Sequence, residues 1–129
     1  AGDGCFRMNM NEIATATDYN IPVIEVVVNN HVLGMVRQWQ DLFYGQRYSQ
    51  TVLNDRVEFA KVAEGLGAKG LHSKHIEEFD NAVKEAIELN IRSIDAQIDK
   101  DGKVFPMVAP GAPISECFGE EDVAEKFGR

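Results

Sequence analysis

Cysteine is scarce in this sequence, and its scarcity limits the chemistry that the chain can carry. The 129 residues include 2 cysteines, Cys5 and Cys117, which are too few for a disulfide framework or a cysteine-rich zinc site. His72 and His75 are the nearest approach to a zinc motif, but no cysteine or third ligand accompanies them. We therefore expect no zinc, and we interpret the cysteines as free thiols of a cytoplasmic protein.

Long apolar runs and an excess of basic residues are missing as well. No run approaches the roughly 18 apolar residues that cross a bilayer. The 21 acidic residues outnumber the 13 basic ones, and the net charge is -8. Nucleic acids and anionic membranes repel such a chain, so we expect neither as a partner. The 44% of hydrophobic residues are enough for the core of one domain.

Strand-like and helix-like segments alternate along the chain. Residues 23–28 are β-branched and nearly all apolar, which predicts a strand buried on both faces. Asn9, with Glu12 three residues later, predicts a capping box. Apolar spacing then predicts four helices and two further strands. The helices are expected over about 9–19, 35–44, 59–66 and 76–89, and the strands over 68–72 and 91–98. This alternation favours an α/β fold, namely a partial doubly wound parallel sheet with flanking helices.

A carboxylate between two glycines opens the chain, and two asparagines follow the strand predicted over 23–28. Glycine lets the backbone approach a ligand closely, and Asp3 stands between two of them. In parallel sheets, ligands bind beyond the carboxyl ends of the strands, where Asn29 and Asn30 would lie. Carboxylate and amide oxygens are ligands that Mg²⁺ prefers, together with phosphate oxygens and water. The sequence therefore predicts a metal-diphosphate site at two neighbouring strand ends.

The residues around these motifs are distinctive. They include Gly2-Asp3-Gly4-Cys5-Phe6-Arg7-Met8-Asn9, Glu12-Ile13-Ala14-Thr15, Tyr19-Asn20-Ile21-Pro22-Val23, Leu33-Gly34-Met35-Val36-Arg37-Gln38-Trp39-Gln40 and Pro106-Met107-Val108. Together they resemble the large catalytic subunit of acetolactate synthase, in its domain that binds thiamine diphosphate (TPP). The resemblance implies that residues 1–118 are the C-terminal part of that domain. Residues 119–129 are expected to be an acidic tail or a short helix.

The resemblance also implies the site residues. Asp3 and Asn30 would bind Mg²⁺ through their side chains and Val32 through its backbone carbonyl, and the metal would bridge the phosphates of TPP. Val36 and Trp39 would line the substrate entrance or an inhibitor-binding surface, although Trp39 fits a core position equally well. The residues expected to contact the cofactor are Gly2, Asp3, Gly4, Cys5, Asn30, Val32, Leu33, Gly34 and Met35.

The activity implied by the resemblance belongs to a larger parent protein. That protein would condense two pyruvates, or pyruvate and 2-oxobutanoate, with loss of CO₂, in branched-chain amino-acid biosynthesis. TPP would supply the carbanion chemistry, and FAD would bind a domain outside this chain. The expected partners are the rest of the catalytic subunit, a second copy of it, a 2-oxo acid substrate and, as a further candidate, a regulatory subunit. No residue here is predicted to be catalytic, so the isolated chain is expected to be inactive.

Three alternatives stay open at this point. The first is a sister TPP enzyme of the pyruvate oxidase or glyoxylate carboligase type, against which the run from Gly34 to Trp39 argues. The second is a non-catalytic fragment or a module that binds Mg²⁺ and TPP without activity. The third is a plain α/β structural domain, in which Asp3 is a turn residue and Asn30 a strand-end residue.

Overall fold

The computed structural model describes residues 1–53, 56–88 and 92–128. The chain divides into two compact units. Unit 1 comprises Ala1–Val32 and Val52–Lys100, and unit 2 comprises Leu33–Thr51 and Asp101–Arg129. The last residue of the helix predicted over 76–89 and the first residue of the strand predicted over 91–98 fall outside the described residues. No helix in the described ranges is long and apolar enough to cross a lipid bilayer.

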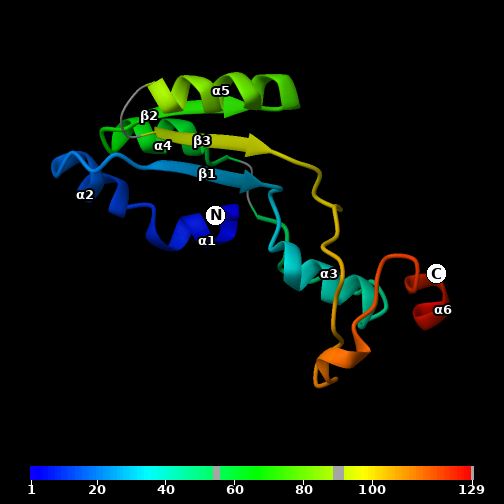
Figure 1. The fold of residues 1–129 in the computed structure, drawn as a ribbon. Helices are drawn as coiled ribbons and strands as arrows, with labels where there is room; N and C mark the ends of the chain where they lie inside the picture. Colours follow the sequence, from blue (N-terminus) through cyan, green and yellow to red (C-terminus); the bar gives the residue numbers. More distant parts are fainter. Residues whose placement is uncertain (54–55, 89–91, 129) are drawn as a thin grey trace. The chain divides into compact units, whose positions relative to one another are not determined.

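A parallel sheet of three strands forms the centre of unit 1 (Figure 1). Its strands are β1 (Ile24–Asn29), β2 (Lys69–Ser73) and β3 (Arg92–Gln97), and β3 lies between the other two. β-Branched and apolar residues favour these strands because such side chains pack well on a pleated surface. Parallel pairing needs a crossover connection between strands, which the intervening helices supply. The predicted α/β fold is therefore confirmed.

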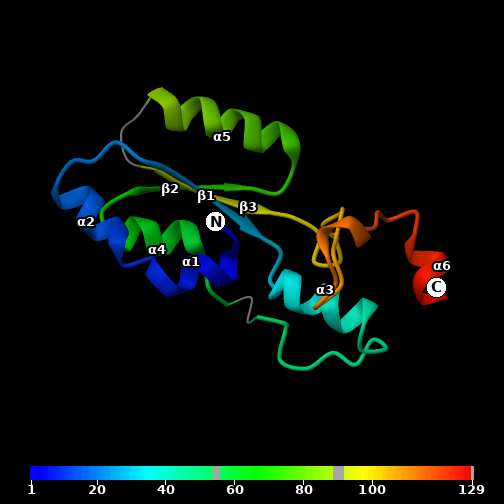
Figure 2. The ribbon, with the colours of Figure 1, turned by 60° about the horizontal axis from the view of Figure 1, so that its bottom comes forward.

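Helices cover both faces of this sheet, as Figure 2 shows. Helix α5 (Ile76–Glu88) lies on one face, and α1 (Asp3–Asn9), α2 (Glu12–Asp18) and α4 (Phe59–Gly65) lie on the other. Each helix buries an apolar side against the sheet, and the two resulting clusters are separated by it. On the α4 face the buried residues are Phe6, Ile13, Val27, Phe59 and Ala63, and on the α5 face they are Ala82, Ala86 and Ile94.

The helix predicted over residues 9–19 is wrong in its start and in its continuity. The structure begins α1 at Asp3 and ends it at Asn9, and α2 begins only at Glu12. The expected capping box is wrong too, because Asn9 is the last residue of α1 and α2 has no side-chain cap. Apolar periodicity did not show the break, since α1 and α2 bury Phe6 and Ile13 in the same cluster.

Strand β1 is not buried on both faces, which corrects the prediction made for residues 23–28. Val27 is fully buried against the α4 face, but Val28 is 43% exposed and Ile24 is 41% exposed. Both exposed residues point to the face that carries α5, and α5 packs on β2 and β3. A strand rich in apolar residues thus keeps one side open over part of its length.

Unit 2 consists of α3 (Gly34–Leu42), the 3-10 helix η1 (Ile114–Glu116) and α6 (Val123–Phe127). Its core is an apolar cluster in which aromatic rings pack edge to face. Met107 and Phe118 also exchange two backbone hydrogen bonds of 2.8 Å. The buried members of the cluster are Leu42, Met107 and Phe118, and Trp39, Phe43, Phe105, Ala109, Val123 and Phe127 pack around them.

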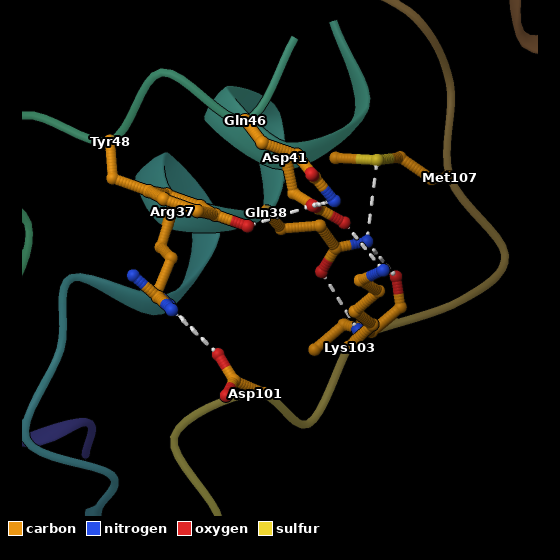
Figure 3. A network of polar contacts seen from close by, with 9 residues as sticks. Arg37, Gln38, Asp41, Gln46, Tyr48, Asp101, Lys103 and Met107 are labelled. Atoms are coloured by element: carbon orange, nitrogen blue, oxygen red, sulfur yellow. Dashed lines mark hydrogen bonds and ion pairs between the residues drawn. The ribbon is translucent and has the colours of Figure 1, made fainter. Parts of the chain in front are cut away.

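Polar side chains of α3 fasten the segment after residue 100 to this helix (Figure 3). The amide of Gln38 pairs with the backbone of Val104, donating to its carbonyl and accepting from its N–H at 2.9 Å each. Arg37 donates to Asp101 at 2.8 and 3.0 Å. Because Gln38 is only 4% exposed, its two bonds satisfy groups that water does not reach.

Asp41 is the acceptor at the centre of the same network (Figure 3). It accepts hydrogen bonds from Tyr48 at 2.8 Å and Gln46 at 3.0 Å, and it forms an ion pair with Lys103. Burial by itself would raise the pKa of Asp41, but the bonds from Lys103, Tyr48 and Gln46 outweigh it and hold the pKa at about 2, below the ordinary 3.8. Asp41 therefore stabilises the fold in its ionised form.

Asp41→Asn is expected to lower the free energy of unfolding at pH 7 by about 1 kcal/mol. That is less than the full pKa shift implies, because solvent screens the partly exposed Lys103. The folded pKa is depressed, so the stabilisation is present above pH 4 and disappears as the pH falls through 2. Urea unfolding of both proteins at pH 7 and pH 2 measures this. An equal difference at the two pH values would contradict it, and Asp80→Asn, which removes an exposed carboxylate of α5 in unit 1, serves as control.

Gly70→Ala is expected to destabilise the chain by about 1–3 kcal/mol or more, the cost of an overpacked core. A Cβ at Gly70 would lie 2.1 Å from the backbone oxygen of Ala60, so β2 and α4 would have to separate. The control is Gly65→Ala in α4, where a Cβ meets nothing within 4 Å and alanine favours the helix. Thermal unfolding should show a lower Tm for the first variant only, and an unchanged Tm for Gly70→Ala would refute this packing.

Candidate metal and diphosphate site

The Gly2-Asp3-Gly4 turn and the end of β1 lie side by side in unit 1. Gly2 forms a parallel bridge with Val28, whose N–H donates to the carbonyl of Ala1 at 2.7 Å. The amino group of Ala1 donates in turn to the carbonyl of Val26 at 2.7 Å. The first two residues are thus a short extended segment parallel to β1. Asp3, which follows this segment, and the turn that follows β1 therefore lie at the same edge of the sheet.

Asp3 is the most unusual polar residue at this edge. It is 2% exposed, and its Oδ2 atom is buried without a hydrogen-bond partner among the described residues. Burial raises the pKa of Asp3, although the backbone N–H groups of Gly4 and Asp3 and the charges of His31 and Arg7 act in the opposite direction. A buried carboxylate oxygen without a partner is costly, and a bound cation would satisfy it.

Two side-chain hydrogen bonds shape the turn that follows β1, over residues 29–32. The Oδ1 of Asn29 accepts from the N–H of His31, and the Oδ1 of Asn30 accepts from the N–H of Val32, both at 3.2 Å. His31 has a φ of 58°, a left-handed conformation that a residue with a Cβ seldom adopts. The 29–32 turn is therefore a defined structure, and it carries the predicted ligands Asn30 and Val32.

Beyond Asp3, the donors for a metal at this edge would be neutral oxygens. Among the residues that the structure describes, no three His, Cys, Asp or Glu side chains converge on one point. One carboxylate with an amide oxygen, a backbone carbonyl and the oxygens of a diphosphate is a donor set that suits Mg²⁺. The residues present thus fit Mg²⁺ held together with a phosphate-bearing cofactor.

The predicted cofactor residues are distributed over the two units. The structure brings together those of unit 1 at the edge of the sheet, and those of unit 2 share α3 and its N-terminal end. The first group is Gly2, Asp3, Gly4, Cys5, Asn30 and Val32, and the second is Leu33, Gly34, Met35, Val36 and Trp39.

The predicted residues of α3 differ in how much surface they present. Met35 is 51% and Val36 is 50% exposed, so both are available to a ligand or to another chain. Trp39 packs instead on the apolar cluster of unit 2, in edge-to-face contact with Phe43 at 6.3 Å between ring centroids. Its indole N–H is buried without a partner in the described part of the chain. The packing of Trp39 thus agrees with the alternative that it is a core residue. Its indole N–H still lacks a partner among the described residues and could donate a hydrogen bond to a ligand.

Sequence reasoning missed Asp95, which lies behind the 29–32 turn. Asp95 is 3% exposed, and its Oδ1 accepts a hydrogen bond of 2.9 Å from the side-chain amide of Asn29. The only signal in the sequence is a carboxylate inside a strand that is otherwise suited to a core. Its partner Asn29 could not be identified from the sequence, because the two residues meet only through the pairing of β1 with β3.

Comparison with known proteins identifies the family of this chain. The family described as "Thiamine pyrophosphate enzyme, C-terminal TPP binding domain" matches residues 1–95. The acetolactate synthase large subunit of Haemophilus influenzae is 41% identical over 117 residues, which are 89% of this chain and 20% of that protein. Acetolactate synthase of Mycobacterium bovis is 44% identical over 132 residues, 98% of this chain and 21% of that protein. The chain spans about a fifth of the length of these relatives.

Solved structures of TPP-dependent enzymes share the fold. Benzoylformate decarboxylase of Polynucleobacter necessarius superposes with a TM-score of 0.72 at 26% identity, over 81% of this chain and 20% of that one. The 4-hydroxybenzoylformate decarboxylase of Rhodococcus jostii gives a TM-score of 0.69 at 22% identity, over 79% and 19%. The resemblance noted in the sequence is confirmed, and the chain belongs to the family of the C-terminal TPP-binding domain of thiamine pyrophosphate enzymes.

Proposed function

We propose that this chain is part of an acetolactate synthase large subunit and that it holds the diphosphate of TPP through Mg²⁺. The observation that carries the proposal is the buried Asp3, with an oxygen that lacks a partner in the described residues and lies at the same sheet edge as the 29–32 turn. The named relatives at 41% and 44% identity support acetolactate synthase over other TPP enzymes.

Each proposed ligand has a separate task in this arrangement. Asp3 supplies the negative charge, while the side-chain oxygen of Asn30 and the backbone carbonyl of Val32 add neutral donors. Gly2 and Gly4 leave room for the phosphates because they lack side chains, and Cys5 is expected to act through its backbone. When bound, TPP supplies the carbanion chemistry of the reaction. On unit 2, Leu33, Gly34 and Met35 are proposed to contact the cofactor, and Val36 and Trp39 the substrate or an inhibitor.

The proposed reaction belongs to the complete enzyme. Two pyruvates, or pyruvate and 2-oxobutanoate, join with release of one CO₂ and yield a 2-hydroxy-2-acyl acid for branched-chain amino-acid biosynthesis. Residues 1–118 would be the C-terminal part of the TPP-binding domain, and the rest of the subunit, its FAD and a second copy would complete the site. Two exposed free thiols, Cys5 and Cys117, support a location in the reducing cytoplasm.

The direct test of the metal role is a calorimetric titration of TPP into this chain with Mg²⁺ and, separately, with a chelator. Binding should require Mg²⁺, and Asp3→Asn should weaken it at least tenfold, or about 1.4 kcal/mol, because Asp3 is the charged residue among the three proposed ligands. Asp18→Asn, which removes an exposed carboxylate from α2, should change nothing. Without metal, Asp3→Asn should leave the stability unchanged or raise it, since a desolvated charge is removed.

Binding of TPP that survives both the chelator and Asp3→Asn would contradict the metal role. A folded chain that binds no TPP would instead favour an incomplete fragment, and the same variants would then be compared in the full-length enzyme.

A product assay on the full-length enzyme separates acetolactate synthase from its sister enzymes. Pyruvate alone should give acetolactate and CO₂ in equal amounts, and benzoylformate should give no benzaldehyde. Acetate from pyruvate in an oxygen-dependent reaction would support the pyruvate oxidase alternative and refute the proposed reaction.

A further inference from the structure

We propose that Asp95 is a positioning residue, which fixes Asn29 and thereby holds the 29–32 turn that carries the metal ligands Asn30 and Val32. The ligand part of this inference rests on the proposed function. The part that concerns the turn rests on geometry within unit 1 alone.

The contact between Asp95 and Asn29 is sealed from water. Asp95 is 3% exposed and Asn29 is 1% exposed, and the Nδ2 of Asn29 donates to the Oδ1 of Asp95 at 2.9 Å. The two side chains come from adjacent strands, since Val27 of β1 pairs in register with Asp95 of β3. Water cannot replace either partner at this depth, so the bond fixes the rotamer of Asn29.

Three polar groups of Asn29 form hydrogen bonds where β1 ends. While Nδ2 donates to Asp95, Oδ1 accepts from the N–H of His31 at 3.2 Å, and the backbone carbonyl accepts from Ile98 at 2.9 Å. Because an N–H must face an acceptor, the His31 bond requires the amide of Asn29 to turn its NH₂ group toward Asp95. The two bonds therefore select one orientation of the amide.

The turn needs such support because its backbone is strained. His31 adopts a φ of 58°, which is unfavourable for a residue with a Cβ unless its surroundings enforce it. The N–H of His31 bonds to Asn29, and the next N–H, of Val32, bonds to Asn30. Loss of the anchor at Asn29 would thus loosen the residues on both sides of Asn30.

A carboxylate suits position 95 better than an apolar side chain would. It is an acceptor only, and a charge-assisted bond to an amide is stronger than a neutral one. A leucine there would leave the NH₂ group of Asn29 buried without a partner. The second oxygen, Oδ2, lies 3.7 Å from Nδ1 of the half-exposed His72, which is too far for a hydrogen bond.

The first experiment follows the turn without any ligand, by amide hydrogen exchange in the full chain. Asp95→Ala should raise the exchange rate of the His31 and Val32 N–H groups about tenfold or more, whereas Asp95→Asn keeps an acceptor and should stay close to the native rate. Ile94→Val is the matched control: its side chain lies in the cluster on the opposite face of β3, so it lowers stability without touching Asn29. Unchanged exchange in Asp95→Ala would overturn the proposal.

The second experiment measures Mn²⁺ affinity in the presence of TPP, by electron paramagnetic resonance of the free ion. Asp95→Ala should bind Mn²⁺ about tenfold more weakly than the native chain, and Ile94→Val should bind it equally well. Asn29→Asp alone sets two carboxylates against each other and should weaken binding too. Combining it with Asp95→Asn restores a donor and an acceptor with the polarity reversed, and should recover the affinity and the slow exchange.

The outcomes separate this inference from the proposed function. Native affinity in Asp95→Ala, or no recovery in the exchanged pair, would refute a positioning role while Asp3 kept its role as ligand. A native chain that binds no Mn²⁺ with TPP would count against the proposed function, and hydrogen exchange would still decide whether Asp95 holds the turn.

Discussion

Parallel pairing of neighbouring strands is the constraint on which the rest of unit 1 depends. Because β1, β3 and β2 all run in one direction, their carboxyl ends meet at one edge, and the segment of Ala1 and Gly2 joins them there. Asp3 and the 29–32 turn are far apart in sequence, yet this pairing sets them side by side. The same pairing places Asp95 behind Asn29. The site is thus a product of strand direction more than of any single motif.

The feature that distinguishes this edge of the sheet is the buried carboxylate of Asp3. Asp3 is buried with an oxygen that nothing in the described chain satisfies, and burial raises its pKa. A fold selected for stability alone would place a neutral or better-solvated residue there. Asp41 in unit 2 is the contrast, because three donors lower its pKa to about 2 and its charge supports the fold. The chain itself satisfies the carboxylate of Asp41, whereas we propose that the carboxylate of Asp3 binds a ligand.

Much of this arrangement could be predicted from local patterns, and the exceptions have physical causes. The alternation of strands and helices and the place of Asp3 and Asn30 at strand ends follow from periodicity and turn residues. The division between α1 and α2 could not, since Phe6 and Ile13 lie on one apolar stripe that continues through the break. The exposure of Val28 depends on how far α5 reaches across the sheet, and the role of Asp95 depends on strand register. Both features depend on tertiary contacts between segments, which the pattern of one segment cannot predict.

The proposed site requires Asp3 and the 29–32 turn to bind one Mg²⁺ ion together with the diphosphate of TPP. A crystal structure with TPP and Mn²⁺ in place of Mg²⁺ would show whether they do, because the anomalous signal locates the ion. We expect one peak at bonding distance, about 2.1 Å, from the Oδ2 of Asp3, the side-chain oxygen of Asn30 and the carbonyl oxygen of Val32. An ion bound elsewhere, with the Oδ2 of Asp3 still without a partner, would contradict it.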